Sequence, residues 1–329
     1  MDGLHVVVGT GPLGLAVMRS LRAQGKQVRM VNRGGTAAIP FGVKRVTADV
    51  RDVASARRAI AGASVVFHCA RVPTTQWVEA LPPIMQGLVT AAGHEGAKVV
   101  YGDNLWVYGL PDGPLTEDLP SRPLGPLGRV RAMVAEMLLD AHQRGQVRAA
   151  IGRASDFYGP SVVQSAVGDL VFGKALERQP ARVIGEPSTP HTYTFIDDFA
   201  RALVTLGERE EALGQVWHVP SAETLTTRRF VENVYEEARV PVMMRTALRW
   251  WVLLRGWLSH RQQVLLELLP QLEHPWIVDH SKFERAFGAH PTTHRAAIHL
   301  TLEWYSRYMG DRDLLADLIA RRAEHPQLG

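Results

Sequence analysis

Residues 4–14 read LHVVVGTGPLG, a short apolar run followed by three glycines spaced as G-x-G-x-x-G. The apolar run predicts a buried strand. Gly9 allows a sharp turn off that strand, Gly11 lets the backbone approach a pyrophosphate, and Gly14 lets the following helix pack closely. Pro12 suits the first turn of that helix, whose unpaired N–H groups favour an anion. We therefore predict a dinucleotide-binding unit, with an incidental glycine turn as the alternative.

The residues that follow alternate between strand and helix patterns. Apolar side chains recur at helical spacing over 13–21, and Gly25 can end that helix. Further strands are predicted at 27–31, 43–47, 64–70, 98–101 and 148–152, with helices at 54–60 and 129–144. This alternation is typical of an α/β protein built on a Rossmann-type, doubly wound parallel sheet.

Beyond residue 160 the pattern loosens, which indicates a smaller lobe over the edge of the sheet. Helices are predicted at 164–176, 199–206 and 243–269, and strands at 182–185 and 215–219. We expect a Rossmann domain for the nucleotide over 1–160 and a mainly C-terminal, substrate-binding lobe over 161–329. Later segments such as 191–219 are expected to return to the first domain.

The composition is that of an ordinary globular protein, with 46% apolar and 21% charged residues among 329. No apolar run approaches the roughly 20 residues of a membrane span, and the N-terminus has no signal pattern. The expected location is therefore cytoplasmic, without a membrane partner. The formal charge of +4 includes no block of five like charges, so no nucleic-acid partner is expected.

For several residues that could suggest a function, we favour a structural role. Cys69, the single cysteine, excludes an internal disulfide and suits the interior of an apolar strand. The thirteen histidines form no recognised ligand pattern, so we expect no metal site. In residues 243–269, predicted to be helical, apolar side chains lie against arginines, and the stretch resembles a basic amphipathic membrane helix. A face that covers the lobe, or a subunit contact in a homodimer, is the favoured alternative.

The end of the second predicted strand bears on the choice of cofactor. A dehydrogenase that selects NAD places an acid there for the ribose 2′-hydroxyl, whereas an arginine accommodates a 2′-phosphate. This sequence has Asn32 and Arg33 and no acid nearby, which favours NADP over NAD; a solvated arginine in a turn is the alternative. Asp49, just past the third strand, is placed to meet the adenine amino group.

These motifs together resemble an extended short-chain dehydrogenase/reductase of the NAD-dependent epimerase/dehydratase family. The resemblance covers about residues 4–235 and rests on GTGPLG, the ADVRD acid, SVVFHCA, VYG, RASDFYGP and TFIDDFARAL. It implies a nicotinamide cofactor bound by residues of these motifs. They are Gly9, Thr10, Gly11, Pro12, Leu13, Gly14, Asn32, Arg33, Asp49, Val50, Cys69, Ala70, Arg71, Arg131, Ala154 and Ser155.

The catalytic positions depart from the family pattern. The family uses a Ser or Thr before VYG and a Tyr-x-x-x-Lys on the next helix, and the matching positions here are Asn104, Leu127 and Arg131. Leucine has no proton to exchange, and arginine stays charged. Where members acting on sugar nucleotides carry an asparagine and an arginine, this chain has Asp156 and His191. A carboxylate would repel a diphosphate, so the chain resembles the atypical members and no nucleotide-sugar substrate is expected.

Two functions remain open. The first is an NADP-dependent oxidoreductase or isomerase acting on a small, largely apolar carbonyl or alcohol compound with a non-standard catalytic site. The second is a non-catalytic NADP-binding redox sensor or regulatory protein. Tyr108 and Tyr158 belong to turn motifs and are expected to be structural. The candidates for the catalytic role are Asp103, Asn104, Arg131, Asp156, His191 and Tyr193.

Overall fold

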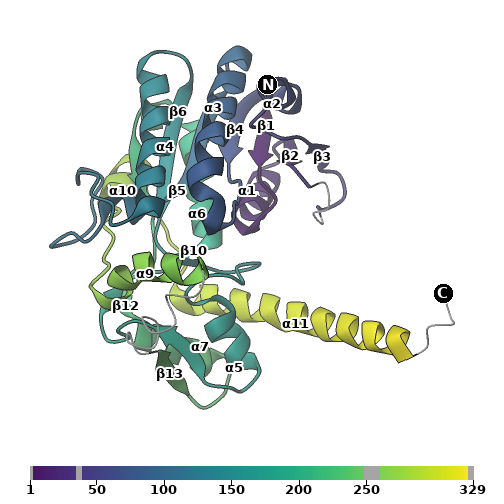
Figure 1. Cartoon of the computed structure of the whole chain (residues 1–329), viewed down its shortest axis with the longest axis vertical. Coiled ribbons are helices and arrows are strands. Elements are labelled where there is room, and N and C mark those ends of the chain that lie inside the picture. The colour runs from purple at the N-terminus through teal and green to yellow at the C-terminus, as the bar shows by residue number, and fades with distance from the viewer. Residues whose placement is uncertain (1–2, 35–38, 248–259, 325–329) are drawn as a thin grey trace.

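A seven-stranded parallel sheet forms the centre of the larger body (Figure 1). The computed structural model describes residues 3–34, 39–247 and 260–324. The strand order is β11-β6-β5-β4-β1-β2-β3, so the order reverses between β1 and β4. This arrangement confirms the predicted Rossmann-type fold. The strands are β1 (Leu4–Val8), β2 (Val28–Asn32), β3 (Lys44–Thr47), β4 (Ala63–His68), β5 (Lys98–Asn104), β6 (Arg148–Ala154) and β11 (Val216–His218).

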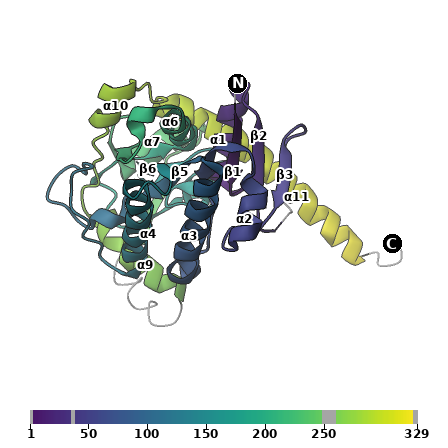
Figure 2. The ribbon, with the colours of Figure 1, turned by 90° about the horizontal axis from the view of Figure 1, so that it is seen from above.

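Helices cover both faces of the sheet, as the view from above shows (Figure 2). One layer contains α1 (Pro12–Ala23), α6 (Ile196–Glu208) and α10 (Ser281–Phe287). The other contains α2 (Val53–Ile60), α3 (Trp77–Glu95) and α4 (Pro126–Gln143). Each layer buries its own apolar cluster against the sheet, because a strand covered on both faces is apolar on both.

A smaller body lies at the carboxyl edge of the sheet (Figure 1). Its interior is aromatic and includes Tyr158, Phe172, Phe230 and Tyr305. The long helix α11 (His294–Glu324) starts in this body and extends away from it (Figure 1). The other elements are β7 (Phe157–Tyr158), α5 (Lys174–Leu176), β8 (Ala181–Ile184), β9 (Pro190–His191), β10 (Thr194–Phe195), β12 (Leu225–Thr226), α7 (Thr227–Glu237), β13 (Met244–Ala247) and α9 (His260–Glu273).

Two helix predictions are wrong in part. The first residues of 243–269 form β13, which pairs in parallel with β8, and a helix is present only from His260. Residues 248–259 lie outside the described part of the chain. In 164–176 the helix starts only at Gly168, as a wide π-helical turn over Gly168–Gly173. The backbone folds back just before it, with the Asp169 N–H donating to the Val163 carbonyl at 3.0 Å.

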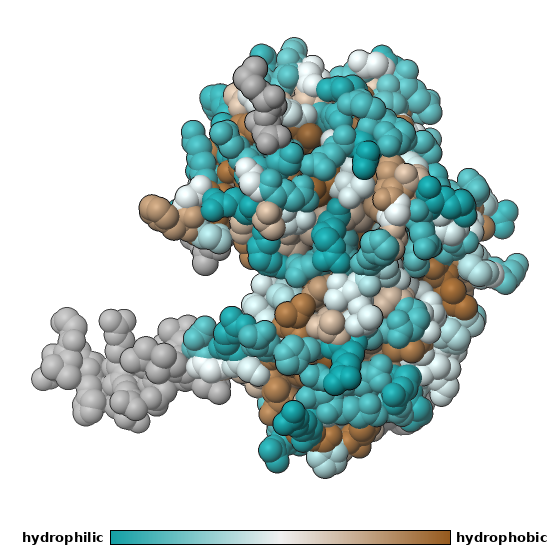
Figure 3. All heavy atoms as spheres, turned by 180° about the vertical axis from the view of Figure 1, so that it is seen from behind, coloured by the Kyte–Doolittle hydropathy of each residue, from teal (hydrophilic) through white to brown (hydrophobic). Residues whose placement is uncertain are grey.

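The visible surface of both bodies is mainly hydrophilic (Figure 3). Hydrophobic side chains appear there in separate patches. Within the described ranges, no helix combines the length and the apolar character needed to cross a bilayer.

Candidate functional site

The glycine loop joins β1 to α1 at the point where the sheet order reverses between β1 and β4. Gly9 has a φ of +114°, a conformation that glycine adopts readily. A Cβ at Gly9 would lie 2.4 Å from the Cys69 carbonyl oxygen, and one at Gly14 would lie 2.0 Å from the Gly9 oxygen. Both glycines are therefore required by close backbone packing between β1, β4 and α1.

The N-terminus of α1 has the form of an anion site. Gly11 is its N-cap and Pro12 its first residue, and among the described side chains none caps the helix. A Cβ at Gly11 would meet only the Arg71 side chain, at 3.5 Å, so the backbone leaves room in front of the helix. Thr10, beside this position, accepts a hydrogen bond from the Asn32 amide at 3.2 Å. Uncapped N–H groups facing open space fit a pyrophosphate.

Asp49 and Arg33 lie close together near the carboxyl ends of β2 and β3. Arg51 donates to both carboxylate oxygens of Asp49, with Nε at 3.0 Å from Oδ1 and Nη2 at 2.5 Å from Oδ2. This hydrogen bond, with a smaller contribution from the Arg33 charge, lowers the pKa of Asp49 to about 2. Asp49 is therefore ionised at neutral pH. Of its neighbours in the predicted cofactor site, Val50 is buried and Arg33 is exposed.

The segment after β4 forms the opposite side of the glycine loop. His68 is buried, and burial lowers its pKa to about 3, so the imidazole is neutral. Its Nδ1 accepts from the Ala70 N–H at 3.4 Å. Cys69 is buried and burial raises the pKa of its thiol, which suits packing. Arg71 donates to the Gln164 side chain, a contact between this loop and the segment after residue 160.

A buried charged group, which we call the Asp103 cluster, lies at the ends of β5 and β6. It consists of Tyr101, Asp103, Tyr108, Arg131 and Arg153. Arg131 Nη1 lies 3.3 Å from one oxygen of the Asp103 carboxylate, and Arg153 Nε lies 3.1 Å from the other. Arg131 also donates to the Tyr101 hydroxyl at 2.6 Å, and Arg153 to the Tyr108 hydroxyl at 2.8 Å. The cluster holds the predicted candidates Asp103 and Arg131 in one network.

His218 continues this network. Its Nδ1 lies 3.0 Å from the Asp279 carbonyl oxygen, which can only accept, so Nδ1 carries the proton. Its Nε2 then accepts from the Tyr108 hydroxyl at 2.9 Å. Burial lowers the pKa of His218 to about 4, consistent with this neutral tautomer. The Tyr108 hydroxyl thus links His218 to Arg153.

Two side chains of α4 have different environments: Leu127 packs in the core, and Arg131 belongs to the Asp103 cluster. Leu127 is buried in the core layer of α2, α3 and α4. One turn later the Arg131 guanidinium lies 4.1 Å from the centroid of the Trp77 ring, a cation–π contact. Asn104 accepts the Trp106 backbone N–H at 3.2 Å through Oδ1, so part of its amide is used locally.

Asp156 and His191 meet between the two bodies. His191 Nε2 lies 3.0 Å from Asp156 Oδ2, and the two side chains are 3% and 30% exposed respectively. The Tyr193 ring packs against His191 at a tilt of 34°, with ring centroids 4.7 Å apart, and its hydroxyl bonds to Thr227 at 2.8 Å. Burial raises the pKa of the Tyr193 phenol, which suits packing rather than proton exchange. The exposed member of this group is therefore the carboxylate.

Ser155 follows Ala154 at the carboxyl end of β6 and is buried. Among the residues that the structure describes, its hydroxyl has no hydrogen-bond partner. A buried hydroxyl without a partner is costly unless a ligand or water satisfies it. Together with the open N-terminus of α1, this orphaned group fits a polar ligand lying along the carboxyl edge of the sheet.

The family model for "NAD dependent epimerase/dehydratase family" matches residues 6–219 of the sequence. The chain belongs to this family. A comparison with curated proteins gives no match. The matched range contains the glycine loop, the Asp103 cluster and the Asp156–His191 pair.

Solved structures similar to this epimerase/dehydratase family member include several epimerases. UDP-glucuronic acid 4-epimerase from Bacillus cereus, in complex with NAD, is 18% identical, with a TM-score of 0.75 over 93% of this chain and 99% of that chain. UDP-glucose 4-epimerase from Thermus thermophilus, also with NAD, is 20% identical, with a TM-score of 0.73 over 92% and 99%. An epimerase from Methanothermobacter thermautotrophicus is 19% identical, with a TM-score of 0.79 over 94% of each chain. These likenesses show the fold.

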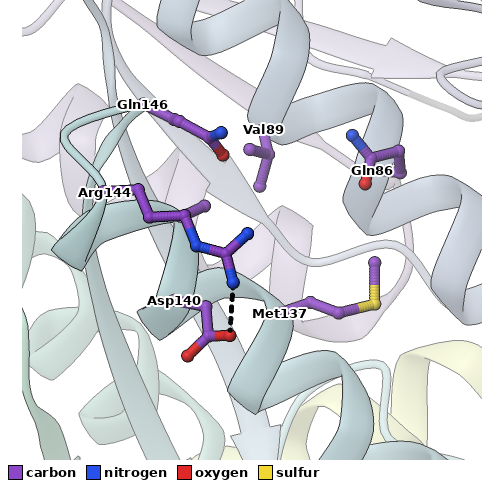
Figure 4. Close-up of a pocket in the computed structure, with 7 residues that line it drawn as sticks. Gln86, Val89, Met137, Asp140, Arg144 and Gln146 are labelled. Carbon is purple, nitrogen blue, oxygen red and sulfur yellow. Dashed lines mark hydrogen bonds and ion pairs between the residues drawn. The ribbon is translucent and has the colours of Figure 1, made fainter.

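A separate cavity of about 270 Å³ lies between α3 and α4 of this family member (Figure 4). Asp140 and Arg144 line it near the C-terminal end of α4 and form an ion pair at 3.2 Å. This end of α4 is opposite to the end that carries Leu127. The cavity contains none of the predicted site residues, and it is not the candidate site.

Three residues of the site were missed by sequence reasoning. Arg153 is visible in RASDFYGP but was not selected, although an arginine ending a buried strand indicates a paired charge. Trp77 lies in a stretch to which no element was assigned. Tyr101 was included only as part of a strand. The positions of these residues around Arg131 follow from tertiary packing, which no local pattern specifies.

Proposed function

We propose that the chain is an NADP-dependent oxidoreductase or isomerase that acts on a small substrate other than a nucleotide sugar. The observation that carries this proposal is the Asp156–His191 pair, which joins a carboxylate just past the end of β6 to an imidazole on β9. The pair lies at the carboxyl edge of the sheet, the edge at which open α/β sheets bind their ligands.

The cofactor in this proposal is held by the glycine loop, by the N-terminus of α1 and by Ser155. A bound nicotinamide nucleotide supplies a hydride acceptor or donor. Arg33 supports NADP over NAD, because an exposed arginine at the end of β2 suits a 2′-phosphate. Two of the similar structures contain NAD. The proposed preference for NADP therefore rests on Arg33 of this chain and not on those structures.

Asp156 is the proposed acid/base. Its carboxylate is the partly exposed member of the pair and can reach a substrate, whereas His191 is buried behind it and fixes its orientation. Asp103 is a weaker candidate because two arginines already occupy its oxygens. Leu127 cannot exchange a proton. In this assignment His191 is a positioning residue.

The charge of Asp156 also bears on the substrate. A carboxylate facing the substrate region repels a diphosphate, which supports a small compound without that group. The lobe, proposed as residues 161–329, supplies the remaining contacts. Arg131, which lies against Trp77, is proposed to hold an oxyanion or the cofactor ribose rather than to transfer a proton.

The experiment has two steps. Calorimetry with NADP(H) and NAD(H) first measures cofactor binding. Absorbance of the reduced nicotinamide is then followed with a panel of small carbonyl and alcohol compounds, with UDP-glucose as the comparison. Tight NADP(H) binding with turnover of a small compound is expected. Failure to bind either nucleotide overturns the proposal.

The buried Leu127 favours a second candidate, a non-catalytic NADP-binding sensor. A sensor binds NADPH while leaving its absorbance unchanged with every compound of the panel.

A homodimer is compatible with both functions. Val78 of α3 and Met133 of α4 are each 51% exposed, so this helix layer offers apolar area to a second copy. Sedimentation analysis tests this state, and a monomer at micromolar concentration overturns it.

A further inference from the structure

The carboxylate of Glu267, on α9, lies at the N-terminus of α4. Its Oε1 accepts from the Gly128 N–H at 2.8 Å, and its Oε2 accepts from the Leu127 N–H at 3.2 Å. Both donors belong to the first turn of α4, where N–H groups have no partner within the helix. A carboxylate is the preferred partner there because the positive end of the helix dipole adds to the hydrogen bonds. One side chain from the C-terminal half of the chain thus caps a helix of the nucleotide-binding body.

Gly125 makes room for this contact. It is the N-cap of α4 and has no side chain to cap the helix itself. A Cβ at this position would lie 2.4 Å from Cδ of Glu267. A serine or aspartate, the usual residues at an N-cap, would therefore displace Glu267. The glycine and the distant glutamate form one capping arrangement.

The other end of α9 is fixed beside the Asp156–His191 pair. The Leu272 carbonyl accepts from the Glu186 N–H at 3.0 Å. Just after the helix, the Trp276 N–H donates to the Pro190 carbonyl at 2.8 Å, next to His191. Glu267 and Leu272 are five residues apart, which is about 7.5 Å along a helix. The last turns of α9 therefore extend from the neighbourhood of His191 to the start of α4.

The same helix contacts the loop after β4. It packs against the short helix η1 (Thr74–Gln76), which directly precedes Trp77. Trp77 in turn stacks under the Arg131 guanidinium. Figure 1 shows α9 between the two bodies, below the lower ends of α3 and α4.

We infer that α9 is a movable wall of the substrate site and that Glu267 is the positioning residue that closes it. The contact fixes the first turn of α4, and with it Arg131 one turn later, while α9 covers the edge between Arg131 and His191. Release of Glu267 frees α9 from α4 but leaves its Leu272 end attached to the lobe. The wall thereby limits the size of the substrate, and this part of the inference rests on the proposed function.

The test compares hydrogen exchange in the full-length protein with three variants. Glu267→Ala removes the carboxylate that caps α4, and Gly125→Ala adds a Cβ that displaces this carboxylate. Glu267→Gln keeps a carbonyl oxygen that can accept one of the two bonds. The controls are Glu136→Ala, an exposed carboxylate on α4, and Gly113→Ala, where an added Cβ meets nothing within 4 Å. NADP(H) affinity of each protein is measured by calorimetry.

We expect exchange in α9 and in the first turn of α4 to accelerate about tenfold in Glu267→Ala and Gly125→Ala, as for loss of a charged hydrogen bond. Glu267→Gln should restore part of the protection, and β1 and β4 should be unaffected. Unchanged exchange in α9, or acceleration spread evenly over the whole protein, overturns the inference. The absence of NADP(H) binding in every protein, wild type included, refutes the proposed function instead.

Discussion

Asp156 and His191 are 35 positions apart in the sequence, yet His191 Nε2 lies 3.0 Å from Asp156 Oδ2. The carboxylate lies two positions past the last residue of β6, and the imidazole belongs to β9 in the smaller body. Of the two, only the carboxylate has substantial contact with solvent. In the proposed function, proton transfer to a substrate is therefore assigned to Asp156.

Asp156→Asn should lower the turnover of whichever small substrate the panel identifies by about 100-fold to 10,000-fold, because the amide cannot take up a proton. Binding of NADP(H) should stay within about twofold, since the glycine loop is untouched. Steady-state kinetics and calorimetry check the two halves. Asp52→Asn, which alters the exposed cap of α2, is the matched control. An Asp156→Asn protein with full turnover would show that another group transfers the proton.

Gly11→Val should abolish nucleotide binding without unfolding the protein. The added side chain projects into the open space before α1, where the pyrophosphate would lie, and its nearest neighbour there is a flexible arginine. Calorimetry measures binding, and circular dichroism confirms folding. Gly113→Val, in open space on a loop, is the control. Undiminished binding by a folded Gly11→Val protein would move the site elsewhere.

Arg33→Ala should remove most of the preference for NADP(H) over NAD(H). Loss of a charge-assisted contact with the 2′-phosphate costs on the order of 1–3 kcal/mol. The ratio of the two dissociation constants is the measurement. Arg58→Ala removes an exposed charge from α2 and should leave the ratio unchanged. Equal affinities in the wild type contradict the assignment of NADP.

UDP-glucose should be neither oxidised nor epimerised by the wild type. Leu127 is buried and has no proton to give, and Asp156 repels a diphosphate. Product analysis by chromatography checks this expectation. Robust turnover of UDP-glucose by the unmodified protein contradicts both arguments.

His218 should make stability fall as the solution is acidified. Burial lowers its pKa in the folded state to about 4, whereas the unfolded value is near 6.5. The unfolded chain therefore binds the proton first, and stability is complete above pH 6.5 and declines toward pH 4. Between pH 7.5 and pH 5 the contribution is about 2 kcal/mol. Denaturant unfolding at both pH values measures it, and His218→Gln should reduce the pH-dependent difference by a similar amount.

The sheet could be predicted because its signals are local. Buried parallel strands such as β1 and β4 read as apolar runs, and Gly9 to Gly14 identify the turn between the first strand and helix. Helix α3 contains Pro82 and Pro83, and proline usually interrupts a helix pattern, so the local sequence does not predict this helix. Strand β13 was read as helix because its pairing with β8 is a tertiary contact.

The sequence predicts which residues belong to the candidate site, but it does not predict which side chains they contact. The sequence predicts Asp103, Asp156 and His191 as site residues because they follow strands or replace family residues. That two arginines enclose Asp103, leaving Asp156 as the accessible carboxylate, depends on burial that the sequence does not reveal. Glu267 gave no signal at all, since its partner is the backbone of a helix 139 positions away.

The chain passes between the two bodies several times. It leaves the sheet after β6, returns for α6 and β11, leaves again for α7, returns for α10 and ends in α11. A fragment that stopped at residue 160 would lose α6, which packs along α1, and β11, which pairs with β6. Neither body is a continuous piece of chain, and a cut at residue 160 would expose the interior of both, because Tyr158 packs in the smaller body and α6 in the larger one.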